Sequence, residues 1–437
     1  MAQTRTASDA PPLKRLSAIL GGSAGNLVEW YDWFAYAAFS LYFAKVFFPK
    51  GDATAQLLQT AAVFAVGFLA RPVGAWVMGI YADRAGRRMA LSVSVAMMCL
   101  GSLVVAVVPG AKTIGVAAPI VLTLARILQG LSVGGEYGAS ATYMSEMAGR
   151  GRRGFWSSFQ YVTIIAGQLI ALGVLIALQH LLSPQALDAW GWRVPFAIGA
   201  VLAVVVFWIQ LGLDETDSFQ AVQGEAAQGE PPRSKTMLLF LDHPRETAII
   251  FALTSAGSLT FYAFTTYMQK FLTNTAHFSK PVGANISAFT LIWYMLAQPL
   301  FGWLADRVGR RLLLAGSFAT MALLTWPILT LLSRQTSATA AFALVAAALT
   351  LLSGYSAVSA VVKAELFPTE VRALGVALPY ATANAVFGGT AEYVAEWFKQ
   401  AGMESGFYIY VSVICAGAFI VAARMRDTQA NSRILED

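Results

Sequence analysis

The chain has 437 residues, of which 57% are hydrophobic and 12% are charged, against about 25% charged in an ordinary soluble domain. A soluble protein this apolar would expose large adhesive patches, so the composition excludes most soluble classes of protein and indicates a lipid bilayer as the solvent. The formal net charge of +6 does not indicate a nucleic-acid surface, because the basic residues lie at the ends of apolar segments rather than on one face.

Residues 1–16 form a polar tail, and the apolar stretch after it has no small-residue cleavage site, which predicts a retained first helix rather than a signal peptide. Twelve apolar segments are each long enough to cross a bilayer as a helix. They lie at 17–44, 57–81, 89–108, 115–147, 153–180, 191–213, 247–272, 283–305, 312–333, 338–366, 371–398 and 403–424. We expect six-helix bundles at 17–213 and 247–424, a linker at 214–246 and a C-terminal tail at 425–437.

The distribution of basic residues predicts the orientation of the chain. Most of the 30 Lys and Arg residues lie in the loops on the side that both termini share with the central linker. Because positively charged loops are retained in the cytoplasm, we expect both termini, the linker and these loops to be cytoplasmic.

A charged loop motif occurs once in each half of the chain. The first copy, Gly79-x-x-Ala82-Asp83-Arg84-x-Gly86-Arg87-Arg88, recurs as Gly302-x-x-Ala305-Asp306-Arg307-x-Gly309-Arg310-Arg311. Glu146 and Arg153 recur in the same way as Glu365 and Arg372. The sequence therefore predicts an all-α membrane protein with twelve transmembrane helices in two pseudo-symmetric bundles, as in an alternating-access transporter.

The doubled motif resembles the signature loop of the major facilitator superfamily, placed after the second and eighth helices. Segments 25–32, 71–74, 130–136 and 190–193 resemble the metabolite:proton symporter family of that superfamily. The resemblance implies the major facilitator fold and import of a small organic acid with protons, without a cofactor. Segments 261–270 and 387–393 narrow the resemblance to transporters of α-ketoglutarate or a related dicarboxylate, with citrate, shikimate or a zwitterionic osmolyte as alternatives. It also implies a multi-pass protein of a bacterial plasma (inner) membrane that works as a monomer.

Two other classes of protein are less favoured. A receptor that senses a dicarboxylate without moving it would need a signalling domain, and the sequence shows none. An enzyme is disfavoured because the sequence has no nucleophile elbow, no phosphate-binding loop and no metal-ligand spacing.

Arg71 is the first of three basic residues inside the predicted helices. It lies 12 residues before Asp83, about 18 Å along a helix and therefore near the middle of the membrane. A guanidinium at that depth needs a partner. The partner is either a substrate carboxylate, gripped by two hydrogen bonds, or a buried ion pair with Glu29 or Asp32.

Arg126 and Lys363 are the other two basic residues inside the predicted helices. Arg126 resembles the facilitator-family arginine that couples proton and substrate movement, and pairing with an acidic neighbour is the alternative. Lys363 either contacts substrate or extends from the helix end to the lipid headgroups. Tyr262, Tyr267 and Asn384 are candidates to line the cavity and bind substrate by hydrogen bonds, with plain helix packing as the alternative.

Three carboxylates are candidates for proton coupling. Glu29 and Asp32 are three residues apart and share a helix face. Two carboxylates so close together in a low-dielectric cleft cannot both stay ionised cheaply, so we expect one of them to hold a proton. Glu136 is the third candidate and Glu392 a weaker one, and permanent salt bridges to the buried arginines are the alternative.

The signature loops are expected to form a cytoplasmic gate. The resemblance implies that Asp83 meets the N-terminus of the eleventh helix and Asp306 that of the fifth, while Glu146 and Glu365 complete ion-pair networks. A positively charged loop that only sets the topology is the alternative. The predicted gate residues are Asp83, Arg84, Gly86, Arg87, Arg88, Glu146, Arg153, Asp306, Arg307, Gly309, Arg310, Arg311, Glu365 and Arg372.

Overall fold

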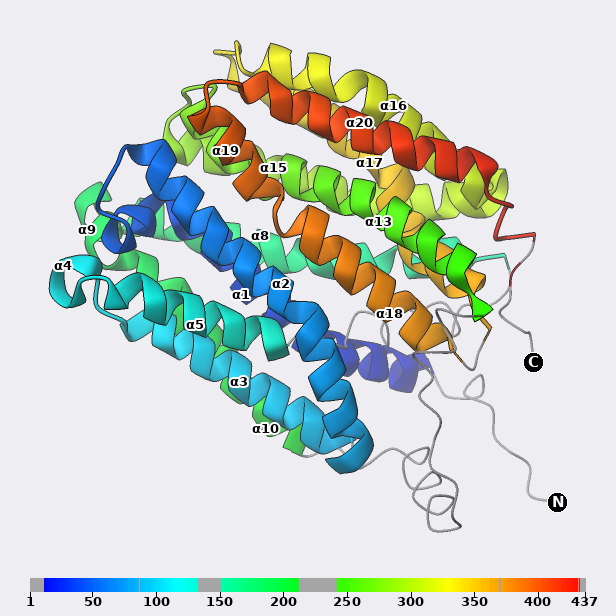
Figure 1. The fold of residues 1–437 in the computed structure, drawn as a ribbon, viewed down its shortest axis with the longest axis horizontal. Coiled ribbons are helices and arrows are strands. Elements are labelled where there is room, and N and C mark those ends of the chain that lie inside the picture. The colour runs from blue at the N-terminus through cyan, green and yellow to red at the C-terminus, as the bar shows by residue number, and fades with distance from the viewer. Residues whose placement is uncertain are drawn as a thin grey trace.

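The computed structural model describes residues 12–85, 87–132, 151–211, 242–368, 371–430 and 432, and these residues are almost entirely helical (Figure 1). The helices of the N-terminal half are α1 (Pro12–Phe47), α2 (Ala53–Ala85), α3 (Arg87–Val107), α4 (Ala111–Ile114), α5 (Ala117–Ser132), α7 (Arg153–Ser157), α8 (Phe159–Leu181), α9 (Pro184–Ala189), the 3-10 helix η2 (Gly191–Arg193) and α10 (Val194–Leu211). Those of the C-terminal half are α13 (Pro244–Phe264), α14 (Met268–Asn274), α15 (Lys280–Val308), α16 (Arg310–Leu332), α17 (Ala338–Leu366), α18 (Arg372–Ala383), the π-helix η3 (Asn384–Gly388), α19 (Ala391–Gln400) and α20 (Glu404–Arg424).

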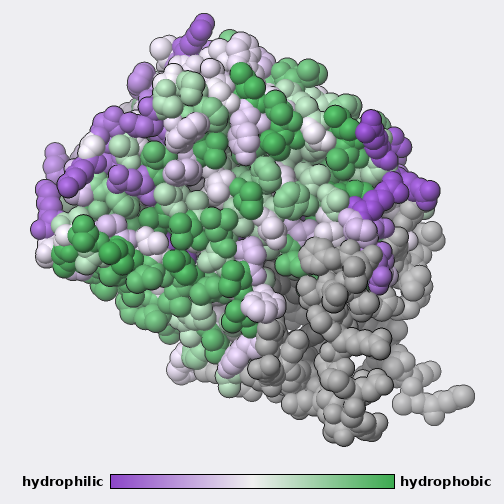
Figure 2. Space-filling view, viewed as in Figure 1, coloured by the Kyte–Doolittle hydropathy of each residue, from purple (hydrophilic) through white to green (hydrophobic). Residues whose placement is uncertain are grey.

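The surface of the molecule is that of a membrane-spanning protein. Within the described residues, eight helices are long and apolar enough to cross a membrane. Figure 2 shows hydrophobic side chains over the middle of one face and hydrophilic side chains gathered toward its two ends. Large apolar side chains such as Trp76 of α2 and Leu312 of α16 are 66% exposed, which is stable only against lipid. The predicted all-α membrane fold is confirmed.

The helix ends differ from the expected ones by a few residues. α1 begins at Pro12, within the expected tail, and α13 begins at Pro244, within the expected linker. Residues 214–241 of the expected linker lie outside the described residues, and the fourth predicted segment is described only as far as Ser132.

Two segments predicted as continuous helices are broken. The backbone N–H of Tyr267 donates to the carbonyl of Tyr262 at 2.9 Å, and that of Gly389 donates to the carbonyl of Asn384 at 2.8 Å. Each bond spans five residues, which widens the turn at α13–α14 and at η3. Such π-type turns and helix breaks within membrane proteins expose polar groups and recur at functional sites. The expectation of unbroken helices at 247–272 and 371–398 was therefore wrong.

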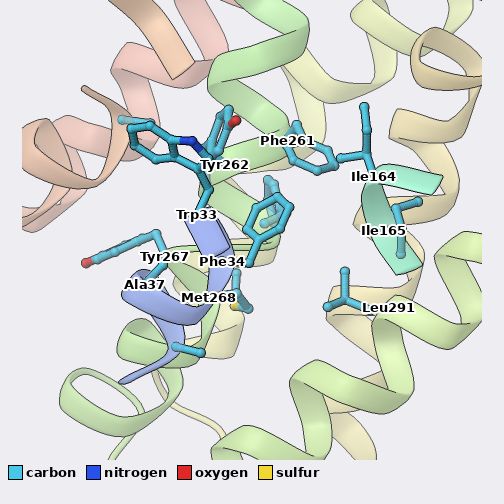
Figure 3. Close-up of a cluster of buried hydrophobic side chains, with 14 of the residues drawn as sticks. Trp33, Phe34, Ala37, Ile164, Ile165, Phe261, Tyr262, Tyr267, Met268 and Leu291 are labelled. Atoms are coloured by element: carbon cyan, nitrogen blue, oxygen red, sulfur yellow. The ribbon is translucent and has the colours of Figure 1, made fainter. Parts of the chain in front are cut away.

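The two halves meet where α7 and α8 pack against α15 and α17, and where α2 packs against α18, η3 and α19 (Figure 1). Figure 3 shows apolar side chains of both halves in this seam. Phe261 of α13 packs at 6.4 Å from Phe34 of α1 and at 5.7 Å from Tyr161 of α8, measured between ring centroids. We call the end of the molecule that carries residues 302–311 the signature-loop face, and the end that carries α4 and α9 the opposite face.

Glycines allow close helix contact within the N-terminal half. A Cβ on Gly130 of α5 would lie 2.0 Å from the carbonyl oxygen of Gly67 on α2. No side chain fits at that separation, so the backbones of α2 and α5 touch directly, as small residues permit in membrane helices.

Candidate functional site

Arg71 of α2 is buried, with 5% of its surface exposed. Its guanidinium lies over the ring of Phe68 at 3.9 Å and over that of Trp33 at 4.2 Å. Within the described part of the chain, its Nε and Nη2 atoms have no hydrogen-bond partner. Stacking on aromatic rings therefore holds this cation in place and leaves donors that can bind an anionic group.

Arg126 of α5 has no exposed surface and forms the centre of a polar network. Its Nη1 lies 3.4 Å from Oδ2 of Asp32 and donates to Oε1 of Gln129 at 2.7 Å. Asp32 also accepts hydrogen bonds from Nε2 of Gln129, at 2.6 Å, and from the hydroxyl of Ser102. Of the two arrangements left open for Arg126, the structure shows the ion pair with an acidic neighbour.

The indole ring of Trp33 joins the two arginines. Its centroid lies 4.2 Å from Cζ of Arg71 and 3.8 Å from Cζ of Arg126. The electron-rich faces of aromatic rings attract cations, which lessens the cost of placing two like charges close together. Glu29, buried one turn before Trp33, lies within electrostatic range of Arg71. The structure thus brings the two predicted arginines and the two predicted carboxylates of α1 together.

A small cavity lies between the two halves. Its lining consists of Trp30, Tyr161, Ile164, Ser258, Phe261, Tyr262, Tyr380 and Asn384. Arg71 lies 5.1 Å from the ring centroid of Trp30 and within electrostatic range of Tyr262 and Tyr380. The ring of Tyr262 and Oδ1 of Asn384 both lie beside Gly388. Two of the three predicted polar candidates therefore line this cavity at the helix breaks; that they bind substrate stays a prediction.

Tyr267 and Lys363 lie elsewhere. Tyr267 packs against Phe271 and Phe407, with ring centroids 6.1 and 5.7 Å away, and it does not line the cavity. Lys363 is 1% exposed and its Nζ lies 4.3 Å from the ring centroid of Tyr380. The idea that it extends to the lipid headgroups was wrong, because its side chain points into the protein behind a cavity wall.

A second buried ionic cluster lies in the C-terminal half. Nζ of Lys270 on α14 is 2.6 Å from Oε1 of Glu392 on α19, with side chains 0% and 4% exposed. Glu396, one turn further along α19, is 1% exposed. The sequence analysis gave Glu392 only a minor role and overlooked Lys270 and Glu396. The four-residue spacing of the two glutamates within an apolar segment was the available signal.

On the signature-loop face, Asp306 joins the two halves. Its Oδ1 accepts a hydrogen bond from the backbone N–H of Gly154 at 2.8 Å, and its Oδ2 accepts one from Phe155 at 2.9 Å. These residues begin the fifth predicted segment, so the expected contact of Asp306 is present. The helices also touch here, because a Cβ on Gly302 would lie 2.5 Å from the carbonyl oxygen of Gly154.

Arg310 extends this network within the C-terminal half. Its Nη2 is 3.4 Å from Asp306 Oδ1, and its Nη1 is 3.3 Å from Oε1 of Glu365. Arg153 lies within electrostatic range of Glu365. Arg372 is buried and donates from Nε to the carbonyl of Phe367 at 3.2 Å.

The remaining loop residues have separate roles. Arg307 stacks on the ring of Trp303, with Cζ at 3.9 Å. Gly309 has φ of +91°, a conformation that favours glycine. The sequence analysis did not foresee a contribution from the C-terminal tail: Asp427 accepts from the backbone N–H of Arg311 at 3.1 Å, and Gln429 donates to the carbonyl of Asp306 at 3.0 Å.

Several predicted site residues lie outside the part of the chain that the structure describes. These are Gly86, Glu136 and Glu146, together with the side chains of Asp83, Arg84, Arg87 and Arg88. Their expected roles stay predictions. Within the described ranges, no group of three His, Cys, Asp or Glu residues could hold a metal ion.

A membrane-embedded helical bundle with buried cations and a cavity between two halves defines a transporter of the major facilitator fold. The crystal structure of a D-xylose-proton symporter shares this fold, with a TM-score of 0.75 and 18% identity over 96% of this chain and 99% of that one. The sequence profile of the family described as sugar (and other) transporter matches residues 18–235 and 226–433. The chain belongs to this family of the major facilitator superfamily.

Two relatives with higher identity are organic-acid transporters by name. The chain is 53% identical to the alpha-ketoglutarate permease of Escherichia coli (strain K12) over 94% of this chain and 93% of that protein. It is 35% identical to a citrate-proton symporter of Salmonella typhi over 91% of each chain. The predicted resemblance is confirmed, and the family is one of transporters rather than enzymes.

Proposed function

We propose that this protein is a proton-coupled secondary transporter that imports α-ketoglutarate, or a closely related dicarboxylate, by alternating access. The observation that carries the proposal is the pair of buried guanidiniums, Arg71 and Arg126, held over one indole ring beside the cavity between the halves. Two cations this close can bind the two ends of one small dianion. The 53% identity to an alpha-ketoglutarate permease supports the choice of substrate.

Arg71 is the primary anchor for a substrate carboxylate. Its unpartnered Nε and Nη2 form the planar fork that binds carboxylate oxygens by two hydrogen bonds. Tyr262 and Asn384 lie at the cavity beside it and can bind the keto oxygen or the second carboxylate. Tyr267 and Lys363 take indirect roles, by packing and by supporting Tyr380.

Asp32 couples proton binding to Arg126. While Asp32 is ionised, it holds Nη1 of Arg126 in an ion pair. A proton on Asp32 removes that attraction, and Arg126 is then free to turn toward a substrate carboxylate. Glu29 acts in the same way toward Arg71, and Glu136 is a further proton carrier.

The membrane potential sets a lower limit on the number of protons. Moving a dianion inward against 100 mV, inside negative, costs about 4.6 kcal/mol, since each charge costs about 2.3 kcal/mol. One proton leaves net negative charge moving inward, and two make the step electroneutral. We therefore propose that at least two protons accompany the dianion, or one if the monoanion is carried.

The signature-loop face is the cytoplasmic face, and the protein is a monomer in a bacterial inner membrane with both termini inside. The contact of Asp306 with Gly154 and Phe155 closes this face while the substrate site is open to the outside. Arg310 and Glu365 brace Asp306. The corresponding Asp83 network acts at the other loop.

Citrate is the second candidate substrate, supported by 35% identity to a citrate-proton symporter. The test is uptake of labelled α-ketoglutarate into proteoliposomes with an acid-outside pH gradient, challenged by unlabelled citrate, succinate, shikimate and betaine. We expect labelled α-ketoglutarate to accumulate. Unlabelled α-ketoglutarate should block this accumulation, and the other four compounds should block it only weakly. If citrate blocks uptake more strongly than α-ketoglutarate does, citrate becomes the assigned substrate. If no acid is taken up in response to the pH gradient, the proposed proton coupling is overturned.

A further inference from the structure

We propose that Glu396 is a second proton-binding site of the transport cycle, located in the C-terminal half and linked to the substrate region through the Lys270–Glu392 pair. The proposal rests on the proposed proton coupling and extends it. It assigns one proton to Asp32 in the N-terminal half and one to Glu396 in the other half.

The charges of the cluster do not balance when both glutamates are ionised. Lys270 lies 2.6 Å from Glu392 and compensates one carboxylate. Glu396 is 1% exposed, and among the residues that the structure describes both its carboxyl oxygens lack a hydrogen-bond partner. A buried carboxylate without a donor is costly, and a bound proton removes that cost. The packing seen here therefore fits a protonated Glu396.

The groups that face Glu396 come from several elements. Lys399 of α19 and Glu404 of α20 lie within electrostatic range of it, as do Glu392 and Lys270. Tyr267, at the helix break, also lies within range of Glu396, and Tyr408 of α20 lies within range of Tyr267. α2 packs against α19, and Phe68 of α2 lies against Gly389. The nearby cations are Lys270, already paired, and Lys399, engaged as described next.

A polar path leads from this cluster toward the opposite face. Nζ of Lys399 donates to Oγ1 of Thr275 at 2.7 Å, and that hydroxyl donates to Oε1 of Glu404 at 2.5 Å. Lys399 and Glu404 are only partly buried and lie at the junction of α19 and α20, one to two turns from Glu396. Protons from the outside can reach Glu396 by this route in the proposed orientation.

On its inner side the cluster approaches the arginine network. Tyr36 of α1 lies within electrostatic range of both Glu392 and Arg126, and the guanidinium of Arg126 is 4.5 Å from its ring centroid. The cluster also lies where the halves meet, because Gln269, next to Lys270, donates to the carbonyl of Ala38 on α1 at 3.3 Å. Movement of this seam changes what surrounds Glu396.

The proposed step follows from these contacts. With the seam open to the outside, Glu396 takes up a proton and an O–H bond forms. Because the protonated side chain is neutral, the seam can close without burying an uncompensated Glu396 carboxylate. When the halves open inward, that O–H bond breaks and the proton leaves through the side of Glu392, whose Oε2 has no hydrogen-bond partner in the closed seam. One proton moves inward per cycle.

The test compares wild type with Glu396→Gln, which resembles the protonated side chain, and measures the ratio of protons to substrate in proteoliposomes at a series of imposed pH gradients and potentials. We expect the ratio to fall by one, so that an inside-negative potential now inhibits uptake, while exchange of labelled for unlabelled substrate continues. Glu396→Asp, which can still bind a proton, should keep the wild-type ratio. Glu404→Gln should keep the ratio and alter only the rate.

An unchanged ratio in Glu396→Gln would overturn the proposal. If that variant does not insert, Glu396→Asp with a shifted pH profile at constant ratio supports the site, and an unshifted profile opposes it. If the wild-type protein shows no proton-driven uptake, the proposed function itself fails, and this outcome is distinct from the others.

Discussion

Nη1 of Arg126 lies 3.4 Å from Oδ2 of Asp32, and the two side chains are 0% and 1% exposed. Breaking a buried pair from one side costs about 3–5 kcal/mol, because the remaining charge is uncompensated. Adding a proton to Asp32 is a way to release Arg126 that leaves no bare carboxylate behind. The pair can therefore act as a switch between two states of Arg126, one paired with Asp32 and one free to bind substrate.

Replacing Asp32 with Asn tests this switch. We expect Asp32→Asn to lose gradient-driven accumulation while it retains exchange of labelled for unlabelled substrate, because the amide cannot release a proton. Wild-type uptake should rise as the outside pH falls, since protons are taken up with the substrate, and this dependence should flatten in the variant. Ser102→Ala, which removes only one hydrogen bond to Asp32, is the matched control and should keep the pH dependence. Full accumulation by Asp32→Asn would exclude Asp32 as the proton carrier.

Replacing Arg71 tests the substrate anchor. Hydrogen bonds to charged groups contribute about 1.5–3 kcal/mol, so Arg71→Ala should lower uptake at limiting substrate by roughly 10- to 100-fold, with normal membrane insertion. Arg71→Lys keeps the charge but not the planar fork, so its uptake should lie between that of the wild type and that of Arg71→Ala. Arg334, an exposed arginine in a loop, is the control, and Arg334→Ala should leave uptake unchanged. Wild-type rates in Arg71→Ala would refute the binding role.

Removing the Asp306 carboxylate tests the gate. Asp306→Ala loses two hydrogen bonds to the backbone of Gly154 and Phe155, so the state open on the signature-loop face should become more populated, by about 10-fold or more. Labelling of a cysteine at Ser158, in a protein with Cys99 and Cys415 replaced by Ala, measures this opening. Asp427→Ala, which removes a tail contact within the C-terminal half, should change labelling less. Equal labelling with and without Asp306 would show that the contact does not hold the face shut.

The close contact of α2 with α5 predicts a stability difference between two glycine variants. Gly130→Ala places a Cβ about 2.0 Å from the carbonyl oxygen of Gly67, whereas a Cβ on Gly173 of α8 has nothing within 4 Å. Overpacking costs about 1–3 kcal/mol, so Gly130→Ala should lower the Tm in detergent. Gly173→Ala should leave it unchanged or raise it, since alanine favours helix. Equal Tm values for the two variants would contradict this packing.

Much of the fold follows from periodic and repeated features of the chain. Apolar runs of membrane-spanning length locate the helices, and the doubled loop at Asp83 and Asp306 relates the halves. The helix breaks at Tyr267 and Gly389 were not foreseen, because hydropathy locates the length of a membrane segment and not a wide turn within it, and such a turn costs little when its carbonyls find donors. Predictions about residues outside the described part of the chain, such as Glu136, stay untested.

The candidate site was predicted as a set of residues but not as a set of partners. Burial of a charge in an apolar helix is visible in the sequence, so Arg71, Arg126, Glu29 and Asp32 stood out. Their pairing was not visible, because helices α1, α2 and α5 place residues next to each other that lie far apart in the chain. For this reason the ion pair of Asp32 with Arg126 was one of several possibilities.

The sequence by itself determined that this protein spans a membrane, that it is built from two related halves and that charged groups lie inside it. These properties depend on local hydropathy and on repetition, which a chain carries without folding. Only the tertiary structure decided that Trp33 lies against both arginines, that Lys270 forms its close ion pair with Glu392, and that the carboxyl oxygens of Glu396 lack a hydrogen-bond partner among the described residues. Those relations depend on distances of a few ångströms between different helices, and only packing sets such distances.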